Sequence, residues 1–167
     1  MFGSDRDEDG AAKAWRMMDE LGFCMLATLE GEGGATAIRA RPMAAYVCRE
    51  EGAVYFLTDA ESAKAEELEA RPQVNLAFGD PRAMQFVSVS GTASVSNDRE
   101  KIRELWGTPA KAWWDSPDDP SLRVLKVAPA DAQYWDSPGK LRAYVRMAAA
   151  AVSDARPAMG ENEKVTL

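Results

Sequence analysis

Residues 53–64 read A-V-Y-F-L-T-D-A-E-S-A-K, an apolar run that ends in a threonine, an aspartate and a short polar turn. The apolar, β-branched and aromatic residues at 53–58 predict a strand. The residues at 63–71 predict a helix, because Asp59 or Ser62 can cap its N-terminus. The sequence therefore predicts a strand followed after a short turn by a helix, and this unit anchors the prediction of the fold.

Five further segments with strand-like patterns flank this one. They are Phe23–Leu29, Ala35–Cys48, Val74–Phe78, Met84–Val95 and Leu122–Trp135. Most connections between them are too short for the crossovers of a parallel sheet. The sequence therefore predicts a mainly β fold with α decoration, a small antiparallel barrel of six strands.

Helices are expected at the margins, because apolar residues recur there at helical spacing or a capping residue precedes the segment. They are predicted at 11–21 with Gly22 as C-cap, from the cap Asp98 to Trp106, and at 141–152. Proline cannot donate to a ladder, so Pro42 is expected at a sheet edge or a bulge, and Pro129 interrupts the last strand.

The 167 residues suit one domain. We expect a disordered acidic lead at 1–10, the barrel domain at 11–152, and a tail at 153–167 that packs on it. A net charge of −7 without a long basic run argues against nucleic-acid binding. No stretch approaches the roughly 20 apolar residues of a spanning helix, and the N-terminus is no signal peptide. No membrane partner is expected, and the predicted location is cytoplasmic.

The chain contains no histidine and two cysteines. The absence of histidine excludes Ser-His-Asp and Cys-His catalysis and His-ligated zinc or haem, so no metal site is predicted. A hairpin that turns near 31–34 places Cys24 opposite roughly position 41, far from Cys48. We therefore expect buried, inert thiols and no disulfide.

Four polar side chains converge on the turn after residue 58. Arg41, Thr58, Ser62 and Lys64 offer the positive charge and donors, next to a helix N-terminus, that a phosphate monoester requires. Plainer explanations stay open. Arg41 can pair with an acidic neighbour across the sheet, Thr58 can be a simple β-former, Ser62 only a cap, and Lys64 part of a solvated helix face.

Several motifs resemble those of a known family in their order and spacing. R-P-M at 41–43, F-L-T-D-A-E-S-A-K at 56–64, V-N-L-A-F at 74–78 and F-V-S-V-S-G at 86–91 resemble FMN-binding split barrels of the pyridoxamine 5′-phosphate oxidase superfamily. L-W-G-T-P-A-K-A-W-W at 105–114, Y-W-D-S-P-G-K-L at 134–141 and G-E-N-E-K-V at 160–165 resemble its general stress protein branch more narrowly.

The resemblance implies a six-stranded antiparallel split β-barrel that forms a homodimer, with FMN at the subunit interface. It implies that Arg41 and Lys64 neutralise the FMN phosphate and that Thr58 and Ser62 donate hydrogen bonds to it. It also implies that the backbone around Pro42 and Met43 approaches the flavin ring.

The chain departs from the oxidase pattern at three places. Ala63 stands where the oxidase has an arginine between its serine and lysine, so one phosphate-binding cation is missing. Phe86 replaces a glutamine, and the adjacent Gln85 would point to the opposite face of the strand. The chain ends V-T-L without the oxidase's arginine-containing substrate motif. Oxidation of pyridoxamine phosphate itself is therefore not expected.

Trp106, Trp113 and Trp114 cluster within nine positions. The favoured interpretation is structural: these side chains cover the barrel and build a dimer interface. A functional interpretation, compatible with the first, stacks Trp113 or Trp135 beside a flavin ring contributed by the partner subunit.

These observations lead to a functional hypothesis. The protein is expected to be a stress-related FMN-dependent oxidoreductase whose flavin is reduced by a nicotinamide nucleotide or similar donor and reoxidised by a small-molecule redox substrate. No side chain stands out as a catalytic acid or base. The alternatives are a non-catalytic flavin-binding, storage or sensor protein and a deazaflavin-dependent reductase; the acidic composition disfavours the latter.

Overall fold

The computed structural model describes residues 9–31, 36–61, 65–137, 147–149, 151 and 161–167. Its helices are α1 (Gly10–Leu21), α2 (Ala65–Ala70), α3 (Arg99–Leu105) and α4 (Thr108–Lys111), with a 3-10 turn at Arg49–Glu51. Its strands are β1 (Phe23–Glu30), β2 (Ala37–Ala44), β3 (Tyr46–Cys48), β4 (Ala53–Asp59), β5 (Gln73–Asp80), β6 (Gln85–Ser96), β7 (Leu122–Asp136) and β8 (Glu161–Thr166).

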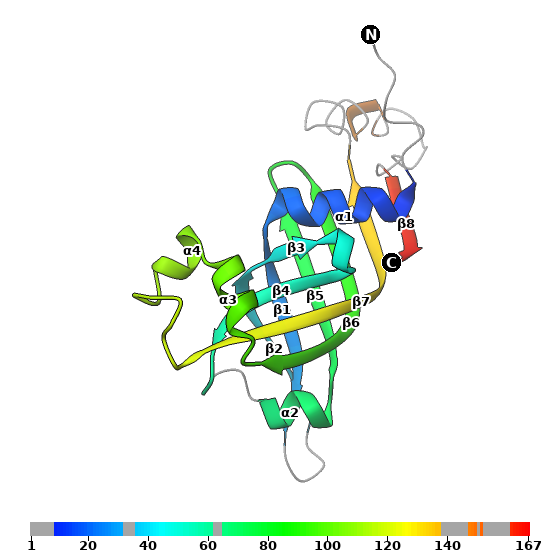
Figure 1. The fold of residues 1–167 in the computed structure, drawn as a ribbon. Helices are drawn as coiled ribbons and strands as arrows, with labels where there is room; N and C mark the ends of the chain where they lie inside the picture. Colours follow the sequence, from blue (N-terminus) through cyan, green and yellow to red (C-terminus); the bar gives the residue numbers. More distant parts are fainter. Residues whose placement is uncertain (1–8, 32–35, 62–64, 138–146, 150, 152–160) are drawn as a thin grey trace.

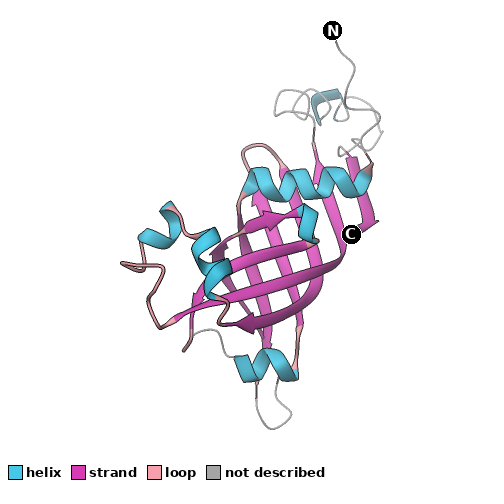
Figure 2. Cartoon of the chain, viewed as in Figure 1, coloured by secondary structure: helices cyan, strands magenta, loops and turns pink. Residues whose placement is uncertain are grey.

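The strands form one antiparallel sheet in the order β2-β1-β5-β6-β7-β4-β3, and β8 pairs with β7 (Figure 1). β2 and β3 stand at the two ends of this order, yet Ala45 alone separates them along the chain. The sheet therefore curls until its two edges are neighbours, as in a split barrel. Helices cover its margins (Figure 2). The predicted class, a mainly β antiparallel split barrel, is confirmed.

The predicted count of six strands is wrong, because the described chain forms an eight-stranded sheet. The segment expected as one long strand at 35–48 is two strands, β2 and β3. The break occurs at Ala45, whose N–H donates to the Gly22 carbonyl at 2.8 Å instead of to a neighbouring strand. The eighth strand, β8, lies in the segment expected only as a packed tail.

Both unusual prolines lie where a missing N–H is tolerated. Pro42 is in β2, the edge strand, opposite Met25. β7 runs through Pro129 without a break, because β4 pairs with its residues 122–127 and β8 with 131–136, so Pro129 falls between the two ladders. A register shift accompanies it at Gly91 of β6, where an added Cβ would stand 2.5 Å from the Ala128 carbonyl oxygen. The expected interruption is therefore a bulge.

The main core fills the barrel under α1. Its largest fully buried side chains include Tyr134, Phe56, Met17 and Met18. α1 ends as predicted at Gly22, which has a φ of 66° and donates to the Met18 carbonyl at 3.0 Å. The helix begins at Gly10; residues 1–8 of the expected acidic lead lie outside the described residues.

A second apolar cluster lies between the sheet and α3. It contains Tyr55, Leu57, Ile102 and Leu122, and Trp114 packs against it. Asp98 caps α3 as predicted, because its Oδ1 accepts the Lys101 N–H at 3.0 Å. Ala110 of α4 belongs to this cluster, so α4 packs next to the end of β4, where the candidate site lies.

The two thiols are free. The β1–β2 register places Cys24 opposite Met43, two residues from the expected position. Burial raises the pKa of the Cys24 thiol to about 12, so that thiol is inert. Cys48 is only partly buried, which corrects the expectation that both thiols are buried.

Most of the helix expected at 141–152 lies outside the described residues. Within the described ranges, no helix is long and apolar enough to cross a membrane. The same part of the chain contains no group of three or more Cys, Asp or Glu side chains arranged to hold a metal ion.

Candidate functional site

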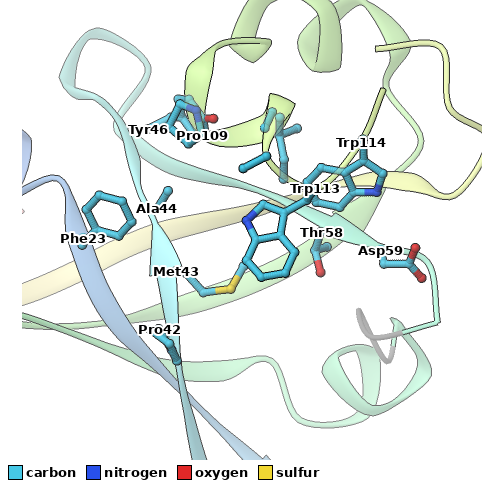
Figure 3. Close-up of a pocket in the computed structure, with 13 residues that line it drawn as sticks. Phe23, Pro42, Met43, Ala44, Tyr46, Thr58, Asp59, Pro109, Trp113 and Trp114 are labelled. Atoms are coloured by element: carbon cyan, nitrogen blue, oxygen red, sulfur yellow. The ribbon is translucent and has the colours of Figure 1, made fainter. Parts of the chain in front are cut away.

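A cavity of about 610 Å³ opens where β2, β3 and the end of β4 meet the α4 segment (Figure 3). Apolar and aromatic side chains dominate its wall. The lining residues are Phe23, Pro42, Met43, Ala44, Tyr46, Leu57, Thr58, Asp59, Pro109, Ala110, Ala112, Trp113 and Trp114. The chain thus brings four distant segments together around one largely apolar space.

β2 supplies one wall of the cavity through Pro42, Met43 and Ala44. Met43 pairs with Cys24 of β1 and packs against the main core, so its position is held from behind. Pro42 points to the opposite face of β2 from Met43 and is exposed. Both residues nevertheless line the cavity, which lies at this edge strand, so the R-P-M motif contributes its second and third residues to the wall.

The end of β4 supplies the polar part of the wall. Thr58 is 8% exposed and pairs with Arg123 of β7, so the sheet fixes its place. Asp59 follows it, and its Oδ1 accepts the Glu61 N–H at 2.8 Å in a tight turn. This turn leads toward α2. Ser62 and Lys64, the other two predicted residues of this motif, lie outside the described residues.

The three clustered tryptophans separate into two roles. Trp106 and Trp114 pack against the second apolar cluster, so they cover the barrel as expected. Their part in a dimer interface stays a prediction. Trp113 lines the cavity (Figure 3), yet its side chain is 81% exposed. Its backbone N–H donates to the Ala110 carbonyl at the end of α4. An indole this exposed at the mouth of an apolar cavity is typical of a binding surface.

Arg41 does not line the cavity. Its Nη2 donates to Thr28 Oγ1 at 2.9 Å and to Glu30 Oε1 at 3.1 Å. The open alternative, in which Arg41 pairs with an acidic neighbour across the sheet, is thus what the structure contains. Glu30, the partner of Arg41, is followed by Gly31, whose carbonyl accepts a hydrogen bond from Arg71 just after α2. The Arg41 side chain therefore reaches the α2 end of the barrel (Figure 1).

Trp135 lies away from the cavity within this chain. It pairs with Phe86 on one side and with Asn162 of β8 on the other. In the next pair of this ladder, Gln85 Nε2 donates to Asp136 Oδ1 at 3.1 Å. A role for Trp135 at a partner's site stays a prediction.

Sequence reasoning missed several lining residues, notably Phe23, Tyr46 and Asp59. A single straight strand over 35–48 gives Tyr46 no place at the cavity, whereas the break at Ala45 brings Tyr46 to its wall. Burial raises the pKa of the Tyr46 phenol, so it stays protonated at neutral pH. The signal available for Asp59 was its place directly after Thr58.

Solved structures and curated proteins resemble this chain over most of its length. A candidate general stress protein 26 from Jannaschia sp. CCS1 is 28% identical with a TM-score of 0.74, covering 94% of this chain and 98% of the other. A general stress FMN/FAD binding protein from Xanthomonas citri is 27% identical with a TM-score of 0.64, covering 77% and 89%. Protein bli-3 of Neurospora crassa is 29% identical over 81% of this chain and 69% of its own length.

General stress protein 26 of Bacillus subtilis is 32% identical over 91 residues, which are 50% of this chain and 62% of that protein. The family model for pyridoxamine 5′-phosphate oxidase like proteins matches residues 9–158, nearly all of the barrel described above. Several of its relatives are general stress proteins by name. The chain therefore belongs to the pyridoxamine 5′-phosphate oxidase-like family.

Proposed function

We propose that this protein binds FMN in the cavity between β2, β4 and α4 and works as an FMN-dependent oxidoreductase. One observation carries the proposal: the cavity joins Pro42 and Met43, Thr58 and Trp113, three of the segments that the sequence motifs single out. The relative from Xanthomonas citri, which is an FMN/FAD binding protein by name, supports a flavin as the ligand.

The wall of the cavity suits an isoalloxazine ring. Its volume of about 610 Å³ lies within the range of small-molecule and cofactor sites. Met43 and Trp113 offer polarisable, apolar surface for a planar ring, and Thr58 and Asp59 confine the polar groups to one end. The residues present therefore fit the ring system of a flavin.

The phosphate requires positive charge, and no Lys or Arg is among the described residues of the cavity wall. The phosphate must then lie beyond Thr58, toward the end of the barrel where α2 and Arg41 are. Ser62 and Lys64 follow Thr58 by four and six residues in sequence, and the motif resemblance gives them the same phosphate-binding role. We therefore propose the ring beside Trp113 and the phosphate toward Arg41, with Ser62 and Lys64 as its further ligands.

The flavin, once bound, supplies the redox chemistry, with a nicotinamide nucleotide or similar donor as reductant and a small molecule as acceptor. The protein's residues bind the phosphate, hold the ring against Met43 and exclude water from the apolar wall. Pyridoxamine phosphate is not proposed as substrate, because a second phosphate would find no cation in the described wall of the cavity.

We further propose that the protein works as a homodimer whose second copy closes the cavity. Phe23, Met25, Ile38 and Pro42 share the outer face of the β1–β2 pair, because paired residues of antiparallel strands point to the same side. Phe23 is 63% exposed, and it lines the cavity together with the exposed Trp113. A continuous apolar surface at the mouth of a cofactor cavity suits an interface.

A titration of purified protein with FMN and with riboflavin tests the proposal. We expect bound-flavin absorbance, a higher melting temperature with FMN, and markedly weaker binding of riboflavin, which lacks the phosphate. Equal affinities for the two flavins contradict the phosphate site. NADH or NADPH oxidation by the loaded protein with dye or quinone acceptors then tests turnover, and tight flavin binding without turnover favours the storage or sensor alternative.

A further inference from the structure

We propose that Glu30 determines the phosphate affinity of the flavin site, because its carboxylate competes with the flavin phosphate for Arg41. This inference rests on the proposed function, and it concerns how tightly and how selectively the site holds FMN. Glu30 lies outside every motif discussed above, and its proposed role is to weaken phosphate binding.

The competition follows from the contacts of the Arg41 guanidinium. Nη2 has two N–H groups, and these meet Thr28 Oγ1 at 2.9 Å and Glu30 Oε1 at 3.1 Å. The Glu30 carboxylate also lies 3.7 Å from Arg39 Nε through its second oxygen. A carboxylate that contacts two arginines occupies the same kind of site that a phosphate monoester takes.

The surroundings keep Glu30 in this place. Its side chain is only 21% exposed, against 68% for Arg39. Glu30 is the last residue of β1, and Gly31 after it is hydrogen-bonded to the α2 region. The Gly31 N–H donates to Glu67 Oε1 of α2 at 3.3 Å, and the Gly31 carbonyl accepts from Arg71 Nη1 at 3.0 Å. These bonds fix the backbone after Glu30, so its side chain starts from a set position beside Arg41.

The charge balance at this end of the barrel favours weak phosphate binding. Glu30 offsets one of the two arginines that it contacts, and a phosphate monoester carries about −1.5 to −2 charges. Ala63 stands where the oxidase pattern has a further arginine, so the sequence supplies no replacement there. Both features lower the electrostatic attraction for the phosphate without touching the ring pocket.

Glu30 could instead serve only to orient Arg41, and the two roles predict opposite results. A glutamine keeps an oxygen that accepts from Arg41 but removes the negative charge. If Glu30 competes with the phosphate, Glu30→Gln tightens FMN binding. If it only orients Arg41, the same change leaves FMN binding unchanged or weakens it.

The experiment measures dissociation constants for FMN and riboflavin by fluorescence titration of the full chain at low and at 0.5 M salt. We expect Glu30→Gln to tighten FMN binding by about tenfold at low salt, less at high salt, and to leave riboflavin binding unchanged. Glu20→Gln is the matched control. It removes the same charge from a salt bridge with Arg16 on α1, at the opposite end of the barrel (Figure 1).

The outcomes separate this inference from the function on which it rests. If wild-type protein binds FMN and riboflavin equally, the phosphate site itself is wrong. If it prefers FMN and Glu30→Gln does not raise that preference above the Glu20→Gln control, the competition is wrong. Should Glu30→Gln fold poorly by circular dichroism, Glu30→Ala replaces it, with the same direction expected and the same result overturning the inference.

Discussion

At the scale of single residues, the proposed phosphate site depends on a few side chains at the α2 end of the barrel. Arg41 combines a permanent charge with a geometry suited to carboxylates and phosphates, which is why Glu30 can take it. Thr58 adds a hydroxyl at a position fixed by its pairing with Arg123. The proposed site therefore depends on few cations, and each of them should matter.

The first prediction concerns these cations. Arg41→Ala and Lys64→Ala should each weaken FMN binding by roughly ten- to hundredfold, because a charge-assisted hydrogen bond contributes about 1.5–3 kcal/mol. Riboflavin binding should change little. Arg82→Ala, in the exposed β5–β6 turn, serves as control in the same fluorescence titration. An equal loss in the control would show that the effect is one of overall charge.

Among the elements, β8 depends on side-chain contacts at the end of β7. Lys13 of α1 forms ion pairs with Asp136 of β7 at 2.9 Å and with Glu161 of β8. The buried Tyr134 hydroxyl lies 3.0 Å from Glu161 and 2.8 Å from Glu163. Because Asp136 and Glu161 are register partners, Lys13 connects three elements at one point.

The ionisation of this cluster predicts how β8 responds to acid. Burial raises the pKa of Asp136, but hydrogen bonds from Lys13 and Gln85 outweigh it and lower that pKa below 3.8. The hydrogen bond from Lys13 lowers the pKa of Glu161 below 4.5. Two carboxyls with lowered pKa values stabilise the fold above their unfolded-state pKa values, and this contribution is lost as the pH falls through the lower, folded-state values.

The second prediction follows from that sign. Thermal stability should decrease as the pH is lowered below about 4.5, and Lys13→Met should lower the melting temperature at neutral pH and flatten this decrease. Hydrogen exchange should show faster exchange in β8 of the variant before the rest of the sheet. Lys164→Met, on the exposed side of β8, is the control. A variant with the same pH profile as wild type would exclude Lys13 as the cause.

At the scale of the whole molecule, the cavity and the exposed apolar surface are continuous. Trp113 and Phe23 belong to both, and Met25 and Ile38 extend the surface along the outer face of β1 and β2. A second copy of the chain that packs on this surface would cover the bound ring. The proposed dimer and the proposed flavin site would then be one structure.

The last prediction tests that link. Trp113→Ala should weaken self-association and FMN affinity together, because aromatic side chains at the centre of an interface contribute most of its binding energy. Sedimentation and flavin titration measure the two effects on the same sample. Trp106→Phe, a conservative change in the second apolar cluster, is the control. A wild-type monomer with full FMN affinity would contradict the link, and a Trp113→Ala dimer that loses flavin would limit Trp113 to ligand contact.

The sequence alone determined those features that depend on neighbours along the chain. The C-cap at Gly22, the cap at Asp98, most strand positions and Pro42 on an edge strand all follow from local pattern and backbone chemistry. The sequence motifs also single out Pro42, Met43 and Thr58, which contribute to two walls of the cavity.

Only the tertiary structure decided the features that depend on which segments meet. The break at Ala45 requires the Gly22 carbonyl, which lies on a different segment, and the continuous β7 requires Gly91 and two separate ladders beside Pro129. The capture of Arg41 by Glu30 and the exposure of Trp113 likewise depend on strand register and on where α4 packs. Pairing across a sheet is long-range in sequence, so no local pattern of residues encodes it.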